Sequence, residues 1–156
     1  MTHLKEGDKA PVFSGTDQDG RLVSMDDLLG KGIILYFYPK DMTPGCTAES
    51  CNLRENYAAL RKMGFEVIGV SADSVKRHRK FADKYELPFT LIADTEREIV
   101  RAYGVWGPKK FMGREYEGIH RTTFVIDAEG VIINIFDKVD TKNHSQQIID
   151  ALNKAD

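Results

Sequence analysis

The stretch that decides the fold is residues 32–51, GIILYFYPKDMTPGCTAESC. It begins with an apolar run, residues 32–38, that is rich in β-branched and aromatic side chains and is typical of a strand buried on both faces of a sheet. A loop with two prolines and a glycine follows, and then come both cysteines of the chain, Cys46 and Cys51. Because such strands deliver their carboxyl-terminal loops to the crevice where α/β proteins work, the cysteines are expected at a functional site.

On either side of this stretch, strand patterns alternate with helix patterns. An N-terminal hairpin is expected about the turn at Asp19-Gly20. Further strands are expected at 65–73 and 89–93, and a second hairpin at 122–136. Helices are expected at 48–63, from a cap at Asp73 or Ser74 to 85, from a cap at Thr95 through 96–103, and at 143–154. This order predicts an α/β fold in which helices flank a central mixed β-sheet.

One segment, residues 106–118 (WGPKKFMGREYEG), fits neither the helix pattern nor the strand pattern. We interpret it as a long functional loop. Its charged side chains Lys109, Lys110 and Arg114 are expected to be solvated.

Length and composition narrow the class of protein. The chain has 156 residues, is 42% hydrophobic and carries a formal net charge of −2. These values predict one globular domain over residues 1–156 without a global field that would attract nucleic acid or a membrane. No apolar run approaches a membrane span, and the N-terminus lacks the apolar core of a signal peptide. We therefore expect a cytoplasmic protein, in which two cysteines serve catalysis, redox sensing or metal binding rather than a permanent disulfide.

The position of Cys46 favours reactivity. Thr43 and Pro44 suit the N-cap and first position of a helix, so Cys46 lies in the first turn, where free N–H groups and the helix dipole favour a thiolate. Since a free cysteine is roughly 3% thiolate at pH 7, complete ionisation gains at most about 30-fold in rate. A fast thiol enzyme therefore needs donors aimed at the transition state. The Thr43 hydroxyl is one candidate, and a cationic donor must come from elsewhere, while Pro39 stiffens the loop.

The spacing of Cys51 sets a geometric condition. Residues five apart in an α-helix have Cα atoms about 8.6 Å apart and point roughly 140° apart around the axis. A disulfide requires Cα atoms within about 7 Å. The cysteines can therefore join only if residues 46–52, which include several mediocre helix formers, unwind after Cys46 is oxidised.

Other interpretations of the cysteines remain open from the residues alone. Both could be small buried side chains. Zinc binding is disfavoured, because the cysteines lack C-x₂₋₄-C spacing and the histidines are scattered. A thioredoxin-type disulfide reductase is disfavoured, because the sequence has no C-x-x-C motif. A peroxide sensor is another alternative, since it would use the same thiol without turnover.

The segment PKDMTPGC resembles the active-site pattern of peroxiredoxins, Pro-x-x-x-Thr-x-x-Cys, and YFYPKDMTPGCTAESC is similar to the bacterioferritin comigratory protein or peroxiredoxin Q subfamily. Further similarity lies in GDKAPVF, DQDG, GVWGPKKFMG and GIHRTTFVID, so the resemblance covers nearly the whole chain.

The resemblance implies a thioredoxin-like fold and a thiol peroxidase for hydrogen peroxide and organic hydroperoxides. In that pattern Cys46 matches the peroxidatic cysteine and Cys51 the resolving one. Pro39 and Thr43 match the loop residues, and Arg121 matches the arginine that reaches the sulfur. The resemblance further implies recycling by thioredoxin, a monomer, and no metal, haem or flavin, because the thiol itself carries the electrons.

Overall fold

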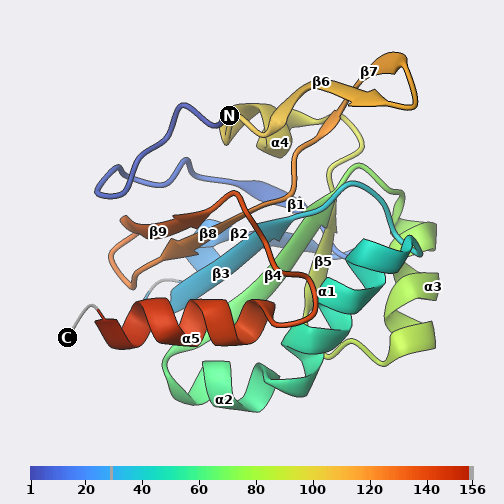
Figure 1. Cartoon of the computed structure of the whole chain (residues 1–156). Coiled ribbons are helices and arrows are strands. Elements are labelled where there is room, and N and C mark those ends of the chain that lie inside the picture. Colours follow the sequence, from blue (N-terminus) through green and yellow to red (C-terminus); the bar gives the residue numbers. More distant parts are fainter. Residues whose placement is uncertain (29, 155–156) are drawn as a thin grey trace.

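The computed structural model describes residues 1–28 and 30–154, and its centre is a seven-stranded sheet in the order β2-β1-β5-β4-β3-β8-β9 (Figure 1). The strands of this sheet are β1 (Ser14–Thr16), β2 (Leu22–Ser24), β3 (Gly32–Phe37), β4 (Phe65–Ser71), β5 (Thr90–Ala93), β8 (Thr122–Ile126) and β9 (Ile132–Phe136). The central strands β3, β4 and β5 run parallel, whereas β1, β8 and β9 pair antiparallel with their neighbours. The expected mixed sheet with an N-terminal hairpin is confirmed.

Helices cover both faces of the sheet (Figure 1). They are η1 (Met25–Leu28, a 3₁₀ helix), α1 (Pro44–Glu55), α2 (Tyr57–Lys62), α3 (Val75–Tyr85), α4 (Glu98–Ala102) and α5 (His144–Lys154). Among the described residues, none of these helices combines the length and apolar character that crossing a membrane demands.

The alternation of side chains along β3 explains why the strand is apolar throughout. Ile33, Leu35 and Phe37 join the core beneath α4, while Ile34 and Tyr36 join the core beneath α1, α2, α3 and α5. Successive side chains of a strand point to opposite faces, so a strand covered on both sides needs a continuous hydrophobic run.

The register of β3 against β8 fixes the position of Arg121. Phe37 pairs with Thr122 in antiparallel register. Arg121, one residue before β8, therefore lies beside the carboxyl end of β3, where the loop leading to α1 begins. Two segments that are far apart in the sequence thus meet at one edge of the sheet.

The prediction of a long loop at residues 106–118 is wrong. This segment forms the two-stranded sheet of β6 (Trp106–Phe111) and β7 (Arg114–Ile119), which projects from the body of the protein (Figure 1). The turn residues Met112 and Gly113 both have positive φ, 51° and 80°. Tight hairpins need this conformation, and Met112 is an unusual residue for its first position, which explains why the pattern is weak.

Two helix boundaries also differ from expectation. The helix expected at 48–63 is two helices, since Asn56 ends α1 and begins α2 with φ −110° and ψ 10°. The helix expected after Thr95 is capped by Arg97 in a left-handed conformation. By contrast, Ser74 caps α3 as expected, accepting a hydrogen bond from the backbone N–H of Arg77.

Candidate active site

The loop between β3 and α1 carries two of the predicted site residues, Pro39 and Thr43, to the carboxyl end of the sheet. Pro39 is half-buried at its start, and Thr43 is the N-cap of α1, with φ −78° and ψ 152°. Pro44 is the first helical residue, where its missing N–H costs nothing. The Thr43 hydroxyl donates to the carbonyl of Lys40 at 2.8 Å, so its oxygen remains able to accept a hydrogen bond.

Cys46 and Arg121 meet in the first turn of α1. The Cys46 side chain is 1% exposed, and Arg121 Nη2 donates to its Sγ at 3.3 Å. Gly45 leaves room for this approach, because a Cβ at this position would make a tight contact of 3.1 Å with Arg121 Nη2. The structure therefore places a cation against the sulfur that the sequence marks as the nucleophile.

Glu49 completes this group from the next turn of the helix. Its Oε1 accepts a hydrogen bond from Arg121 Nη1 at 2.7 Å, and its side chain is fully buried. Burial raises the pKa of Glu49 to about 7, although Arg121 acts in the opposite direction. Burial lowers the pKa of Arg121, but the negative charges at Glu49 and Cys46 outweigh it and the pKa is raised. Sequence reasoning missed Glu49, yet its position three residues after Cys46 puts it on the same helix face.

His144, at the start of α5, lies behind Glu49. Its Nε2 is 3.7 Å from Glu49 Oε2 and 2.8 Å from the Thr123 hydroxyl. Burial lowers the pKa of His144 to about 4, so the ring is neutral near pH 7. Among the described residues Glu49 Oε2 has no hydrogen-bond partner. Glu49 therefore depends on Arg121 for its stabilisation.

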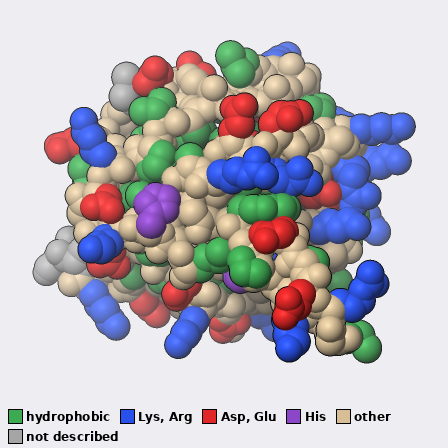
Figure 2. Space-filling view, turned by 90° about the horizontal axis from the view of Figure 1, so that it is seen from above, with side chains coloured by type: hydrophobic (Ala, Val, Ile, Leu, Met, Phe, Trp, Pro, Cys, Tyr) green, Lys and Arg blue, Asp and Glu red, His purple; other side chains and the backbone are tan. Residues whose placement is uncertain are grey.

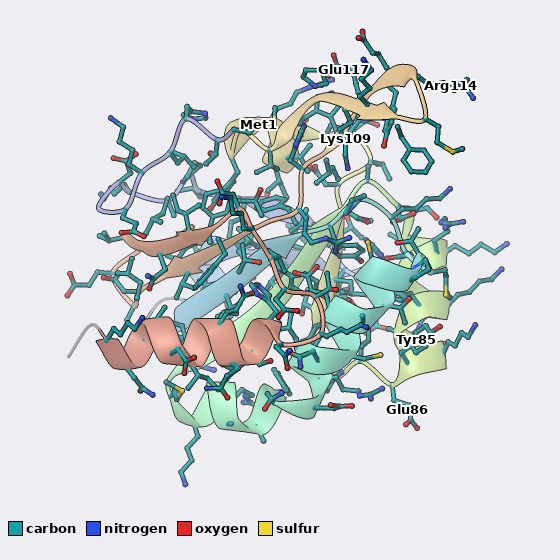
Figure 3. All side chains as sticks on the ribbon, viewed as in Figure 1. Met1, Tyr85, Glu86, Lys109, Arg114 and Glu117 are labelled. Atoms are coloured by element: carbon teal, nitrogen blue, oxygen red, sulfur yellow. The ribbon has the colours of Figure 1, made fainter. Side chains whose placement is uncertain are left out.

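Lys109 on β6 is a second residue that sequence reasoning missed, because it was expected to be solvated. Its Nζ donates to the carbonyl of Ile119 at 2.9 Å. Burial lowers the pKa of Lys109, Arg121 lowers it further, and Cys46 acts in the opposite direction. In Figure 3 Lys109 lies on the side of the hairpin toward the body, whereas Arg114 lies at its outer end. Once the hairpin is known, strand alternation predicts this inward direction.

A cavity of about 360 Å³ separates the hairpin from the loop, and its lining includes Pro39, Asp73, Arg97, Trp106 and Lys109. The guanidinium carbon of Arg97 lies 4.8 Å from the centroid of the Trp106 ring, a cation–π contact. The cavity borders the loop that precedes Cys46. Figure 2, which views this side of the molecule, shows basic and acidic side chains interspersed with hydrophobic ones over much of the face.

Cys51 is half-buried on the same helix, and both cysteines are free thiols. α1 is continuous from Pro44 to Glu55, so the two cysteines are held in helical geometry. A bond between them requires the helix to unwind, as expected from their spacing.

One cluster of potential metal ligands lies among the described residues. Ligand atoms of Asp41, Asp73 and His78 lie within 4.8 Å of one another. Their atoms are engaged with one another and with Tyr38 and Ser71 in hydrogen bonds of 2.6–3.5 Å. This cluster fits a polar network that supports the loop rather than an open metal site.

Comparisons with known proteins identify relatives of this chain. The model of the AhpC/TSA family matches residues 6–135. Peroxiredoxin Bcp of Escherichia coli strain K12 is 47% identical over 152 residues, which are 97% of each chain.

Solved structures resemble the whole chain. PrxQ of Xylella fastidiosa superimposes with a TM-score of 0.92 at 26% identity and 99% coverage of both chains. A bacterioferritin comigratory protein of Xanthomonas campestris has a TM-score of 0.86 at 30% identity, covering 95% of this chain and 99% of its own. That structure was described in connection with alkyl peroxide reduction activity.

Proposed function

Because the chain belongs to the AhpC/TSA family of peroxiredoxins, we propose that it is a thiol peroxidase in which Cys46 reduces hydrogen peroxide and organic hydroperoxides and Cys51 resolves the product. The observation that carries this proposal is the contact of 3.3 Å between Arg121 Nη2 and Cys46 Sγ at the start of α1. It joins a cation, a helix N-terminus and a sulfur, which is what the attack of a thiolate on an O–O bond requires.

In the first step the Cys46 thiolate attacks the terminal oxygen of the hydroperoxide. An S–O bond forms, the O–O bond breaks, and an alkoxide or hydroxide leaves and takes up a proton. Arg121 and the backbone N–H of Cys46 stabilise the negative charge that develops on the oxygens. The Thr43 oxygen, whose own proton is bound to Lys40, accepts a hydrogen bond from the hydroperoxide. Pro39 limits the access of water.

In the second step the start of α1 unwinds and the Cys51 thiol attacks the Cys46 sulfenic acid, which gives a disulfide and water. A dithiol reductant, for which we propose thioredoxin, then returns both cysteines to thiols. All of the protein's cysteines in this cycle belong to one chain, so a monomer, built as one domain over residues 1–156, suffices. Reduction by a dithiol suits a reducing compartment such as the cytoplasm.

The decisive experiment mixes reduced protein with hydrogen peroxide and identifies the products by mass spectrometry. The parent protein should form a Cys46–Cys51 disulfide, Cys46→Ser should consume no peroxide, and Cys51→Ser should stop after one oxidation of Cys46. Full turnover by Cys46→Ser would overturn the assignment of the nucleophile. Oxidation of the parent protein without sustained consumption of a dithiol would instead indicate a sensor.

A further inference from the structure

We infer that Asp41 and His78 are positioning residues that hold the loop of Cys46 in its peroxide-reactive conformation and thereby set how readily the start of α1 unwinds. This inference rests on the proposed function, because unwinding matters only if Cys51 must reach Cys46. Neither residue contacts the sulfur in any described interaction.

The pair is buried at the middle of the loop. Asp41 is 1% exposed and His78, on α3, is 0% exposed. Asp41 Oδ2 lies 2.7 Å from His78 Nδ1, and Asp41 Oδ1 accepts a hydrogen bond of 2.6 Å from the hydroxyl of Tyr38. Burial raises the pKa of Tyr38 well above its ordinary value, so Tyr38 is a phenol that can donate.

The backbone of Asp41 is anchored as well. Its N–H donates to Asp73 Oδ2 at 2.8 Å, and its carbonyl lies 3.4 Å from Arg77 Nη2. Asp73 in turn accepts a hydrogen bond of 2.7 Å from the hydroxyl of Ser71, at the end of β4. The middle of the loop is therefore fixed to the corner where β4 leads into α3.

His78 connects this anchor to the sheet. Its Nε2 lies 3.0 Å from the carbonyl oxygen of Ile92 in β5, on the side of the ring opposite Asp41. Both ring nitrogens thus lie within hydrogen-bond distance of an oxygen. Because breaking a buried hydrogen bond leaves a partner without solvation, this anchor is stronger than a surface contact.

The loop needs such an anchor because its conformation is not a relaxed one. Met42, directly after Asp41, has φ 69°, in the left-handed region that a side chain with a Cβ disfavours. Thr43 and the first turn of α1 follow at once. If the anchor at Asp41 weakens, Met42 can relax, and the segment that carries Thr43 and Cys46 loses its fixed start.

The α1 side of this segment is held by different contacts. Arg121 binds Glu49, and the hydroxyl of Tyr36 lies 2.9 Å from Ser50 Oγ. These contacts remain when Asp41 or Tyr38 is changed, so the contribution of the loop anchor can be measured separately from that of the groups around the sulfur.

The test compares Asp41→Asn and Tyr38→Phe with Tyr57→Phe. Tyr57→Phe is the matched control, since it removes a hydrogen bond of 2.6 Å between a tyrosine and Glu66 away from the loop. Reduced proteins are mixed with hydrogen peroxide, quenched with a thiol-blocking reagent, and analysed by mass spectrometry for the sulfenic acid and the disulfide. This gives two rate constants for each protein.

We expect Asp41→Asn to slow the formation of the sulfenic acid about tenfold and to speed its conversion to the disulfide, while Tyr38→Phe shifts both rates in the same directions by about threefold. Tyr57→Phe should match the parent protein in both rates. A residue that served only general stability would not move the two steps in opposite directions. Unchanged rates, or a fall in both, in folded Asp41→Asn or Tyr38→Phe would overturn the inference.

Absence of a disulfide in the parent protein would overturn the proposed function and not the anchor. Hydrogen exchange of the reduced protein tests the anchor alone. Backbone amides of residues 41–43 and 45–50 should exchange faster in Tyr38→Phe than in Tyr57→Phe. Equal exchange in the two variants would show that Asp41, to which Tyr38 donates, does not hold the loop.

Discussion

At the scale of single residues, the guanidinium of Arg121 connects the Cys46 sulfur with the buried carboxyl group of Glu49. Its two amino groups lie 3.3 Å and 2.7 Å from these partners. Because the group is planar with donors in fixed directions, holding one amino group on Glu49 aims the other at the sulfur. Both the charge and the shape of this side chain should therefore matter.

Arg121→Ala should slow the first oxidation of Cys46 by more than the roughly 30-fold that ionisation of a thiol can supply. Arg121→Lys keeps the charge but not the paired geometry, so its rate should fall between those of the parent protein and the alanine variant. Stopped-flow mixing with hydrogen peroxide measures these rates. Arg114→Ala, at the exposed end of β7, is the control and should leave the rate unchanged. A loss of less than 30-fold in Arg121→Ala would reduce Arg121 to a minor role.

Glu49 should make stability depend on pH in a recognisable direction. Its pKa is raised from 4.5 to about 7, so the folded protein binds its proton more tightly than the unfolded chain does. The free energy of unfolding should therefore fall as the pH rises from 4.5 to 7, by up to about 3 kcal/mol. His144 acts oppositely, because its pKa is lowered to about 4, and its contribution rises with pH between 4 and 6.5.

Urea unfolding of Glu49→Gln at several pH values separates these effects. Relative to the variant, the parent protein should lose stability as the pH rises through the window from 4.5 to 7. The variant should show only the rise expected from His144. Glu115→Gln, an exposed site, should reproduce the parent profile. A constant difference between parent and Glu49→Gln across this window would mean that Glu49 does not titrate there.

At the scale of elements, α1 must be stable enough to present Cys46 and weak enough to release it. Thr47 and Ser50 are mediocre helix formers near its start. Asn52 is different, because its side chain bonds the carbonyl of Lys142 and the N–H of Ser145 at 2.9 Å and 2.7 Å. These bonds tie α1 to α5, so we expect unwinding to stop at Asn52 rather than to pass it.

Thr47→Ala should slow the formation of the Cys46–Cys51 disulfide about twofold, because alanine stabilises a helix by about 0.5 kcal/mol relative to threonine. Asn153→Ala gives a similar gain in helix stability in α5, far along that helix from the contact between Ser145 and Asn52. It should leave the rate of disulfide formation unchanged. Time-resolved mass spectrometry of the oxidised proteins provides the comparison. Equal rates in the two variants would argue that helix unwinding does not limit the resolving step.

At the scale of the whole molecule, the two-sided core explains what the sequence could predict. The apolar runs of β3, β4 and β8 predict strands. Thr43, Pro44 and Cys46 lie on one short segment, so local sequence patterns are enough to place these three residues together. Arg121 comes from a distant strand, and only the resemblance to a family pointed to it. The break at Asn56 was missed because helical periodicity continues across it, and Lys109 was missed because its hairpin turn lacks the usual residues.

Gly69 in β4 shows how closely the layers pack. A Cβ there would lie 2.8 Å from Tyr36 Cζ and 2.9 Å from Leu91 Cδ2. Gly69→Ala should therefore lower the free energy of unfolding by roughly 1–3 kcal/mol through overpacking, as measured by urea unfolding. Gly118→Ala, on the hairpin, is a useful comparison because its nearest neighbour is the flexible chain of Lys109. Equal stability of Gly69→Ala and the parent protein would contradict this account.

The chain has one tryptophan, Trp106, and its ring lies beneath the guanidinium of Arg97 in the lining of the cavity next to Pro39. The emission of an indole depends on the charge and solvent around it, so a shift of the neighbouring loop when the start of α1 unwinds should change its intensity. The protein thus carries an intrinsic optical reporter in the cavity that borders the loop preceding Cys46. We therefore expect that oxidation and reduction can be followed by fluorescence in real time, without a label or a coupled assay.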